Sequence, residues 1–411
     1  MSITKLRVGV IGHGFMGKMH AHAYRSLPFY YDPAPAKIEL LGVSTQSEAS
    51  MKRAMEDWGY TVGTTDFREL CAHPDIDIIN CCTPNYLHKD VLLCALENGK
   101  HVYMDKPLCL NLDEARVMAD CANQYPNQIT QMTFQYRFVP AMMRAKQLIE
   151  QGALGRLFSA RVCYLHAGYI DPRRPHSWRL DVSKSGKGGA LFDLGSHVVD
   201  LTRHLLGEFD EVFHRGETFI KERPLPDNPD KTAPVEVDDI SILLFKLKNG
   251  AVGTLESSRL ANGVQDEIRF EAHGDKGAIR FNLMQPNFLE FYDATAPGGD
   301  FGGERGFKAI ECVARYPKPA SLPGPKNTIG WERFHVHCLY HFVQAIVDGA
   351  QPHPSIIDGA MTQAILEAAL ESGASKQWTK VPPINGTESE ISHHGDYEKD
   401  NTNQNPKPTS R

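Results

Sequence analysis

The first 133 residues alternate short apolar runs with helical stretches, and this alternation restricts the fold more than any other feature of the chain. The apolar runs, which have the composition of buried strands, span residues 7–11, 38–44, 76–81, 101–104 and 129–133. Helical patterns occupy the segments between them, at 18–26, 47–58, 66–71, 88–98 and 112–124. Strands that alternate with helices form a parallel sheet covered on both faces. The pattern therefore predicts an α/β domain with a doubly wound parallel sheet over residues 1–133.

The first strand-to-helix turn carries three glycines, Gly12, Gly14 and Gly17, in G-x-G-x-x-G spacing within RVGVIGHGFMGKMH. The first glycine of such a turn permits a tight bend, the second lets a pyrophosphate approach the backbone, and the third allows close packing of helix on strand. The free N–H groups of the following helix then face the phosphates. A plain glycine turn is the alternative, but the strand-turn-helix context favours a Rossmann domain that binds a dinucleotide.

The end of the second strand bears on the choice between NAD and NADP. A carboxylate there would hold the ribose 2′-hydroxyl of NAD and repel a 2′-phosphate. This chain has Ser44 and Thr45 at that place, and the nearest acid is Glu48. No arginine lies beside Thr45 to receive a 2′-phosphate. The sequence leaves both cofactors open.

After about residue 155 the pattern changes to strands separated by turns, at 158–165, 212–218, 240–245, 252–257, 268–272 and 278–281. This pattern predicts a second, α+β domain over residues 134–384, with a large, open and mainly antiparallel sheet. A basic loop at 167–190, a stiff proline-rich excursion at 223–236 and a Gly/Pro-rich stretch at 294–330 interrupt it. The polar residues 385–411 are expected to form a disordered tail.

Polar residues follow two of the buried strands of the first domain. Thr83, Pro84 and Asn85 come after the strand that ends at Cys81, and Lys106 follows the next strand in MDKPL. Ligands of doubly wound folds bind at the carboxyl ends of the strands, so these side chains are candidates for the site. An ordinary turn with Asn85 as helix N-cap and a solvated surface lysine are the structural alternatives.

The segment GGALFDLGSHVVDLTRHLLG, residues 188–207, places Asp193 and His197 four residues apart. On a helix this spacing puts both side chains on one face. An aspartate beside a histidine can orient its ring and favour the protonated form, as acid-base catalysis requires, although such pairs are often purely structural. A metal site is not expected, because no further His or Cys with regular spacing lies nearby.

The composition of the chain restricts the kinds of binding partner and cellular compartment that we expect. The chain has 411 residues and a formal net charge of −6, with no basic block to bind a nucleic acid backbone. No apolar run approaches the roughly 20 residues that cross a bilayer. Nine cysteines without a CxxC pair are typical of reduced thiols, so we expect a cytoplasmic protein.

The combination of these motifs resembles the Gfo/Idh/MocA oxidoreductases over roughly residues 5–380: the glycine turn, TPNxLH, Asp-Lys-Pro in place of Glu-Lys-Pro, and GGxxxDxGxHxxD. Within the family, GFMGKMHAHAY, FQYRFVPA, SWR, and VDD with GAVGTLESSR resemble the levoglucosan dehydrogenases and related glycoside 3-dehydrogenases. Two departures stand out, because Asp105 replaces the usual Glu and Gln135 stands where relatives often have Asn.

The resemblance implies roles for individual residues. Lys106, Asp193 and His197 match the catalytic Lys, Asp and His, and Arg137 and His166 become candidates for the substrate pocket. The implied cofactor-binding residues, together with those of the turns above, are Gly12, Gly14, Phe15, Met16, Gly17, Ser44, Thr45, Thr83, Pro84, Asn85, His88, Asp105, Lys106, Gln135, Trp178 and Arg179.

The expected activity is NAD(P)-dependent oxidation of a secondary hydroxyl on a sugar, anhydrosugar, cyclitol or glycoside, with C3 of a glucose-like ring as the hypothesis for the carbon. His197 would be the general base, Lys106 would stabilise the alkoxide, and Asp193 would orient His197. The alternatives are an NADPH-dependent reductase of a related oxo-sugar or dihydrodiol-type substrate, and a non-catalytic dinucleotide sensor. The family resemblance also implies a homodimer or homotetramer through the sheet of the second domain.

Overall fold

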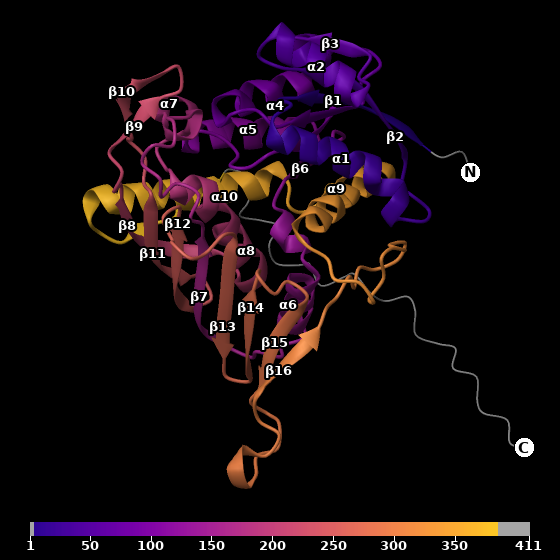
Figure 1. Ribbon diagram of the computed structural model, residues 1–411. Helices are drawn as coiled ribbons and strands as arrows, with labels where there is room; N and C mark the ends of the chain where they lie inside the picture. Colours follow the sequence, from indigo (N-terminus) through magenta and orange to yellow (C-terminus); the bar gives the residue numbers. More distant parts are fainter. Residues whose placement is uncertain (1–3, 385–411) are drawn as a thin grey trace, which may run out of the picture.

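The computed structural model describes residues 4–384 and contains two large sheets, one in each half of the chain (Figure 1). The first sheet is parallel throughout and has the strand order β3-β2-β1-β4-β5-β6. This order confirms the predicted doubly wound sheet. Its strands are β1 (Lys5–Ile11), β2 (Lys37–Ser44), β3 (Val62–Thr64), β4 (Ile78–Cys81), β5 (His101–Met104) and β6 (Thr130–Met132).

Three helices of the first half begin where a polar side chain satisfies a free N–H group of the first turn. The side chains of Ser47, Asp66 and Asn111 each accept a hydrogen bond from the first turn of a helix. The first helix starts directly after Gly14 and continues through Pro28, so the expected range 18–26 was too short at both ends. The helices are α1 (Phe15–Tyr30), α2 (Glu48–Trp58), α3 (Phe67–Ala72), α4 (His88–Glu97) and α5 (Leu112–Gln124).

The second sheet has nine strands in the order β16-β15-β14-β13-β7-β12-β11-β8-β17. Only the β12–β7 pair is parallel, which confirms a mainly antiparallel sheet. Its strands are β7 (Leu157–Leu165), β8 (Phe209–Glu217), β11 (Ile240–Leu247), β12 (Val252–Ser258), β13 (Glu267–Gly274), β14 (Gly277–Asn282), β15 (Phe288–Asp293), β16 (Phe307–Glu311) and β17 (Thr379–Lys380).

Two loop predictions for the second half were wrong. The proline-rich segment 223–236 contains most of a two-stranded hairpin, β9 (Glu222–Leu225) and β10 (Asn228–Pro234). The Gly/Pro-rich stretch 294–330 contains β16, which pairs with β15 at the sheet edge. Backbone pairing at an edge tolerates proline and glycine, and this explains why composition alone misled the prediction.

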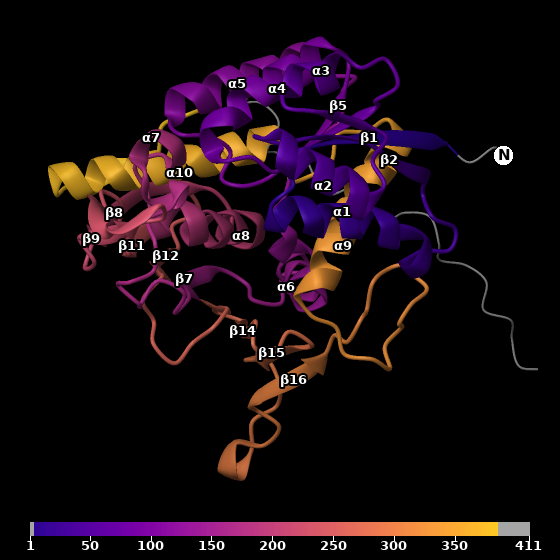
Figure 2. The same cartoon turned by 45° about the horizontal axis from the view of Figure 1, so that its top comes forward.

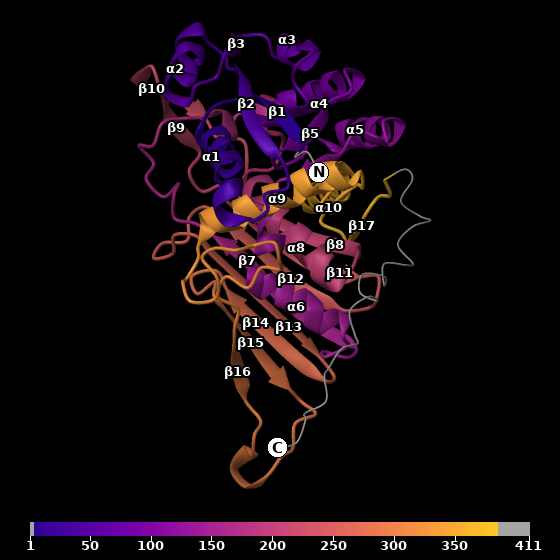
Figure 3. The same cartoon turned by 90° about the vertical axis from the view of Figure 1, so that its right-hand side faces the viewer.

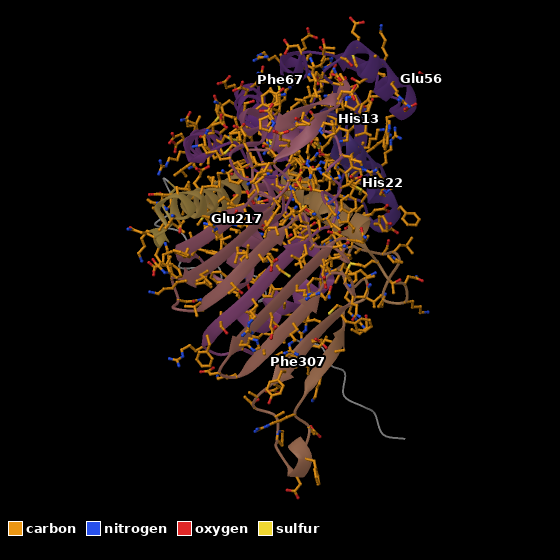
Figure 4. The ribbon with its side chains drawn as sticks, turned by 60° about the vertical axis from the view of Figure 1, so that its left-hand side comes forward. His13, His22, Glu56, Phe67, Glu217 and Phe307 are labelled. Atoms are coloured by element: carbon orange, nitrogen blue, oxygen red, sulfur yellow. The ribbon has the colours of Figure 1, made fainter. Side chains whose placement is uncertain are left out.

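Helices α6 (Pro140–Glu150), α8 (Ser196–Leu206) and α10 (Ile356–Ser375) pack on one face of the nine-stranded sheet (Figure 3). On the other face no helix of residues 4–384 crosses the strands between Glu217 and Phe307 (Figure 4). Exposed apolar side chains on its strands include Ile242, Leu244 and Val252. The large open sheet expected from the sequence is therefore present.

Two late helices return to the first half of the molecule. Helix α9 (Trp331–Asp348) lies beside α1 (Figure 2), and its Leu339 and Phe342 share an apolar core with Val8 and Tyr24. Helix α10 buries Ile356 and neighbouring residues in a second core with α5 and β5. The parallel sheet ends at β6, just before the predicted boundary at residue 133, but its packing depends on the second half.

Three expectations concern the chain as a whole. Across residues 4–384, no helix has the length and apolar character that a membrane crossing requires. All nine cysteines are free thiols. The segment 385–411, expected to be a disordered tail, lies outside the described residues.

Candidate active site

A cleft of about 1290 Å³ runs along the carboxyl ends of the parallel strands and continues onto the second sheet. Its walls come from both halves of the chain: the glycine turn, the loops after β4 and β5, the loop before α7 (Val182–Ser185) and the start of α9. Ligands of doubly wound folds bind at this edge of the sheet. The geometry of the cleft therefore makes it the candidate active site.

Each glycine of the turn has the structural role that its position in the motif predicts. Gly12 has φ +86°, and a Cβ there would lie 2.6 Å from the carbonyl oxygen of Cys82. A Cβ on Gly17 would lie 2.1 Å from the carbonyl oxygen of Gly12, so this glycine sets the packing of helix on strand. Gly14 faces open space and caps α1 with no side chain of its own. The turn thus leaves room for a pyrophosphate at the N-terminus of α1.

Hydroxyl groups line the cleft at the end of β2. Ser44 and Thr45 both lie there, and the Thr45 hydroxyl is 2.7 Å from the hydroxyl oxygen of Ser50. Arg68 lines the same part of the cleft. This region offers donors to the ribose of a dinucleotide and has no carboxylate directly after β2.

Most of the other predicted cofactor residues also line the cleft. Asn85 is not a helix N-cap; its side-chain amide donates to the carbonyl oxygen of Ser185 at 2.8 Å and ties the turn after β4 to the basic loop. In that loop the Arg179 guanidinium lies 4.5 Å from the centre of the Trp178 ring. The lining residues of the predicted set are Gly12, Gly14, Phe15, Met16, Ser44, Thr45, Thr83, Pro84, Asn85, Asp105, Lys106, Gln135, Trp178 and Arg179.

His88 and Gly17 lie behind the cleft wall and not in it. The buried His88 ring places one nitrogen 3.0 Å from the carbonyl oxygen of Thr83 and the other 3.0 Å from that of Pro107. It therefore joins the turn after β4 to the turn after β5. The structure gives His88 a supporting position instead of the cofactor contact that the family resemblance implied, whereas Gly17 has the packing role that its place in the turn predicts.

Lys106 lies between the two halves and pairs with Asp193. Its Nζ donates to Oδ1 of Asp193 at 3.0 Å and to the backbone carbonyl of the same residue at 2.7 Å. A second cation, Arg259, donates to Oδ2 of Asp193 at 3.0 Å. Burial alone would raise the pKa of Asp193, but Lys106, Arg259 and Arg179 outweigh it and hold this pKa well below the usual range. Two cations thus share one ionised carboxylate at the cleft.

His197 is 5% exposed and packs edge-on against the rings of Tyr136 and Tyr164. Its Nδ1 has no hydrogen-bond partner in the part of the chain that the structure describes. Burial and the nearby charge of Lys106 lower the pKa of His197 well below the usual value, against the opposing effect of Asp193. The imidazole is therefore uncharged at neutral pH and able to accept a proton.

Within residues 4–384 the ring of His197 donates no hydrogen bond to Asp193, and one reason is that both carboxylate oxygens accept hydrogen bonds from Lys106 and Arg259 instead. The local backbone supplies a second reason. Residues Leu191–Gly195 form a π-helical turn before α8 starts at Ser196, so the i,i+4 register of an α-helix does not apply to the pair. Asp193 therefore does not orient the His197 ring through a hydrogen bond. Its charge does favour the protonated form, as predicted, but burial and Lys106 outweigh that effect.

The two predicted substrate-pocket residues have different positions. His166 lines the cleft, with its Nε2 3.1 Å from Asp266, which also accepts a hydrogen bond from Tyr164. Arg137 is 6% exposed and does not line the cleft. It forms ion pairs with Asp200 at 2.5 Å and Asp358 at 3.1 Å inside the protein. The pocket position predicted for Arg137 is therefore wrong.

The sequence prediction missed several cleft residues of the second half, namely Tyr136, Tyr164, Arg259, Asp266, Trp331 and His335. Arg259 directly follows β12, and Ser258 pairs with Leu165 of β7 in parallel register. This pairing brings Arg259 to the same edge as His166. An arginine that follows an apolar strand can be predicted as a cleft residue only when the pairing of that strand is known.

The cleft fits a dinucleotide. Its glycine turn, the free helix N-terminus and the hydroxyl groups after β2 are suited to a pyrophosphate and a ribose, and Lys106 and His197 line the same cleft. Among residues 4–384, no cluster of three or more His, Cys, Asp or Glu side chains could hold a metal ion. The fold and this cleft define a dinucleotide-dependent oxidoreductase.

Comparison with known proteins identifies the family. Residues 6–133 match the model of the oxidoreductase family with an NAD-binding Rossmann fold, and residues 142–280 match the GFO/IDH/MocA C-terminal domain. The chain belongs to the Gfo/Idh/MocA family and is an NAD-binding oxidoreductase.

Three relatives show the extent of the similarity. Levoglucosan dehydrogenase of Pseudarthrobacter phenanthrenivorans is 36% identical over 93% of this chain and 100% of its own length. A solved structure of levoglucosan dehydrogenase in complex with NADH and L-sorbose superposes with a TM-score of 0.88, at 36% identity over 92% of this chain and 99% of that one. Glucose-6-phosphate 3-dehydrogenase of Bacillus subtilis is 25% identical over 92% of this chain and 99% of its own.

Proposed function

We propose that this protein oxidises a secondary hydroxyl group of a sugar, anhydrosugar, cyclitol or glycoside, and that the carbon oxidised is C3 of a glucose-like ring. The observation that carries the proposal is the convergence of Lys106 from the first half with Asp193 and His197 from the second at one end of the dinucleotide cleft. An alcohol placed there would meet a proton acceptor and a cation together. We place the reaction in the cytoplasm, in keeping with nine free thiols.

In the proposed mechanism the uncharged His197 accepts the hydroxyl proton of the substrate. The ammonium group of Lys106 stabilises the negative charge that develops on the substrate oxygen. Asp193 holds Lys106 in place and does not act through His197, because its oxygens bind Lys106 and Arg259. Bound NAD supplies the acceptor for the hydride that leaves the same carbon.

The chemistry of the cleft supports a polyol substrate. Around the reaction centre lie hydroxyl, imidazole, carboxylate and guanidinium groups from Tyr136, Tyr164, His166, Asp266 and Arg259. Such a wall satisfies the many donors and acceptors of a sugar better than it would an apolar alcohol. The names of the relatives, levoglucosan dehydrogenase and a glucose-6-phosphate 3-dehydrogenase, support both the sugar class and the position on the ring.

The test is to incubate the purified protein with NAD⁺ and with NADP⁺ separately against panels of sugars, anhydrosugars, inositols and glycosides. Reduced nicotinamide absorbance reports turnover, and analysis of the product by NMR identifies the oxidised carbon. Failure of every pyranose and cyclitol would reject the substrate class. Oxidation at another carbon would reject only the position.

We also propose that two or four copies associate through the open face of the nine-stranded sheet. The exposed side chains of Ile242 and Leu244 lie on β11, and Val252 lies on the neighbouring β12. Burying them between copies would remove apolar surface from water. Ile242→Asp should shift the sedimentation coefficient toward that of the monomer, whereas Phe29→Asp, an exposed apolar side chain on α1, should leave it unchanged.

A further inference from the structure

His335 is a buried histidine of the cleft wall whose role the mechanism does not explain. It lies on α9, one turn after Trp331, and is 1% exposed. Its ring packs edge-on against Trp331 with 4.3 Å between ring centres. Trp331 in turn stacks on Phe15 of the dinucleotide-binding half, at 5.6 Å and an interplanar angle of 20°. The late helix α9 thus supplies part of the cleft beside the glycine turn.

Neither ring nitrogen of His335 has a hydrogen-bond partner among residues 4–384. The other two histidines of α9 differ in this respect. His337 lies 2.7 Å from the hydroxyl of Tyr31, and His341 lies 3.1 Å from the side-chain oxygen of Gln131. A buried polar atom without a partner is energetically unfavourable. Of the three histidines on this helix, only His335 lines the cleft, and only His335 has both nitrogens unpaired.

The ring of His335 is uncharged. Burial lowers its pKa well below the usual value, and the nearby His20 and Lys106 lower it further. A neutral imidazole has one N–H donor and one acceptor nitrogen. It is therefore suited to an uncharged polar group, such as an amide or a hydroxyl, and poorly suited to a phosphate.

A second unpaired atom lies in the same wall. The side-chain oxygen of Gln135 is buried and has no partner within the described residues, and Gln135 also lines the cleft. The charge of Lys106 lowers the pKa of His335. The pKa of His197 is lowered mainly by burial and Lys106, and His335 contributes further to this lowering. The unpaired groups thus lie near the residues that we propose to handle the proton and the alkoxide.

We propose that His335 hydrogen-bonds an uncharged polar group of the bound ligands next to the reacting carbon. The group comes from one of two sources: the carboxamide of the nicotinamide or a hydroxyl of the substrate. The carboxamide source requires only the NAD binding of the family, while the hydroxyl source rests on the function proposed above. In both cases His335 is a binding residue that the sequence motifs do not include.

The experiment compares His335→Phe with the wild-type protein. Phenylalanine keeps a flat ring against Trp331 and removes both nitrogens. His341→Phe is the control, because it removes a histidine of the same helix that does not line the cleft. The NADH dissociation constant is measured by fluorescence titration without sugar, and KM for the sugar is measured at saturating NAD⁺. Loss of one hydrogen bond should raise one of these constants about three- to tenfold.

A raised NADH dissociation constant would support the proposal and assign His335 to the carboxamide. An unchanged NADH constant with a raised KM would support it and assign His335 to the substrate. Both constants within about twofold of wild type, in a variant with an unchanged circular dichroism spectrum, would overturn it. His335→Asn, which restores a donor and an acceptor, should recover part of the loss and is the fallback variant if phenylalanine prevents folding. The NADH dissociation constant can be measured even if the protein oxidises no sugar. Failure of the proposed role of His335 can therefore be distinguished from failure of the proposed function.

Discussion

The molecule contains two buried ion clusters of opposite composition, one at the cleft and one in the core. At the cleft, Lys106 and Arg259 share the single carboxylate of Asp193, so positive charge is in excess. The side chain of Asp193 is 25% exposed there and that of Lys106 is 17% exposed. The surplus cation is what an alcohol losing its proton needs beside it.

In the core, the proportions are reversed. The guanidinium of Arg137 is shared by the carboxylates of Asp200 and Asp358. Its side chain is 5% exposed and that of Asp200 is 1% exposed. The Nε of Arg137 and one of its terminal nitrogens donate to these two carboxylates inside the protein, and Arg137 does not line the cleft. The comparison indicates that a buried arginine within a family motif takes part in the reaction only when its charge lies at a cavity and is not neutralised by buried carboxylates.

The strongest test of this contrast is Arg137→Met. It leaves the buried carboxylate of Asp200 without its ion-pair partner, while Asp358 keeps His353 at 2.8 Å and Arg203 at 3.9 Å. Breaking a buried pair from one side costs about 3–5 kcal/mol. The free energy of unfolding in urea should fall by that amount, while turnover per folded molecule stays near wild type. Arg161→Met is the control, because Arg161 forms only an exposed pair with Glu271 at 3.9 Å. A large loss of turnover with unchanged stability would place Arg137 in the active site after all.

At the cleft, Lys106→Ala should affect the reaction and leave the fold intact. Loss of one charge that stabilises a developing oxyanion costs about 100- to 1000-fold in turnover. The NADH dissociation constant should change little, because the glycine turn and the helix N-terminus are untouched. Lys89→Ala, which removes a lysine paired with Glu114 outside the cleft, is the control. Near-normal turnover in Lys106→Ala would refute the assigned role.

The second cation of the cleft gives a smaller effect. Arg259→Met removes one of the two groups that hold Asp193, and a hydrogen bond between charged groups is worth about 1.5–3 kcal/mol. We expect kcat to fall at least about tenfold with little change in KM for NAD⁺. Arg259 is a positioning residue, so Arg259→Lys should restore part of kcat. Equal losses in both variants would show that shape and not charge is required.

The pH dependence of turnover gives a finer test at the cleft. The base must be neutral to act, and burial together with Lys106 lowers the pKa of His197. The acid limb of kcat/KM should therefore lie below the ordinary histidine value of about 6.5. Rates measured from about pH 5 to about pH 8 check this. A midpoint above 6.5 would mean that an acidic neighbour, as the sequence first suggested for Asp193, dominates the ring.

The nucleotide half was predictable because its information is local. Each strand is a short apolar run followed by a turn, and Gly12 and Gly14 mark the phosphate turn without help from the rest of the chain. The three-residue strand β3 was too short to show a pattern. The expected helix at 18–26 missed both ends of α1. The helix begins after Gly14, which offers no side-chain cap, and ends where the backbone N–H of Tyr31 donates to the carbonyl oxygen of Leu27.

The second half of the site was predictable only in part because its contacts are between distant segments. Asp193 and His197 were found as a motif, but their hydrogen bonds depend on Arg259 and on a π-helical turn that spacing does not reveal. Arg137 was assigned to the pocket since its partners Asp200 and Asp358 lie far along the chain. Residue types were readable from the sequence, whereas the partner of each charge was not.

The return of α9 and α10 to the nucleotide half has a consequence for how the chain is made. Translation delivers the first sheet early, but the helices that cover Val8 and Met132 emerge only when residues 331–375 leave the ribosome. Until then part of the apolar surface of the nascent first half is in contact with solvent, and this half is prone to aggregation. A fragment cut after residue 133 should therefore be insoluble on its own, and the cleft can form only at the end of synthesis.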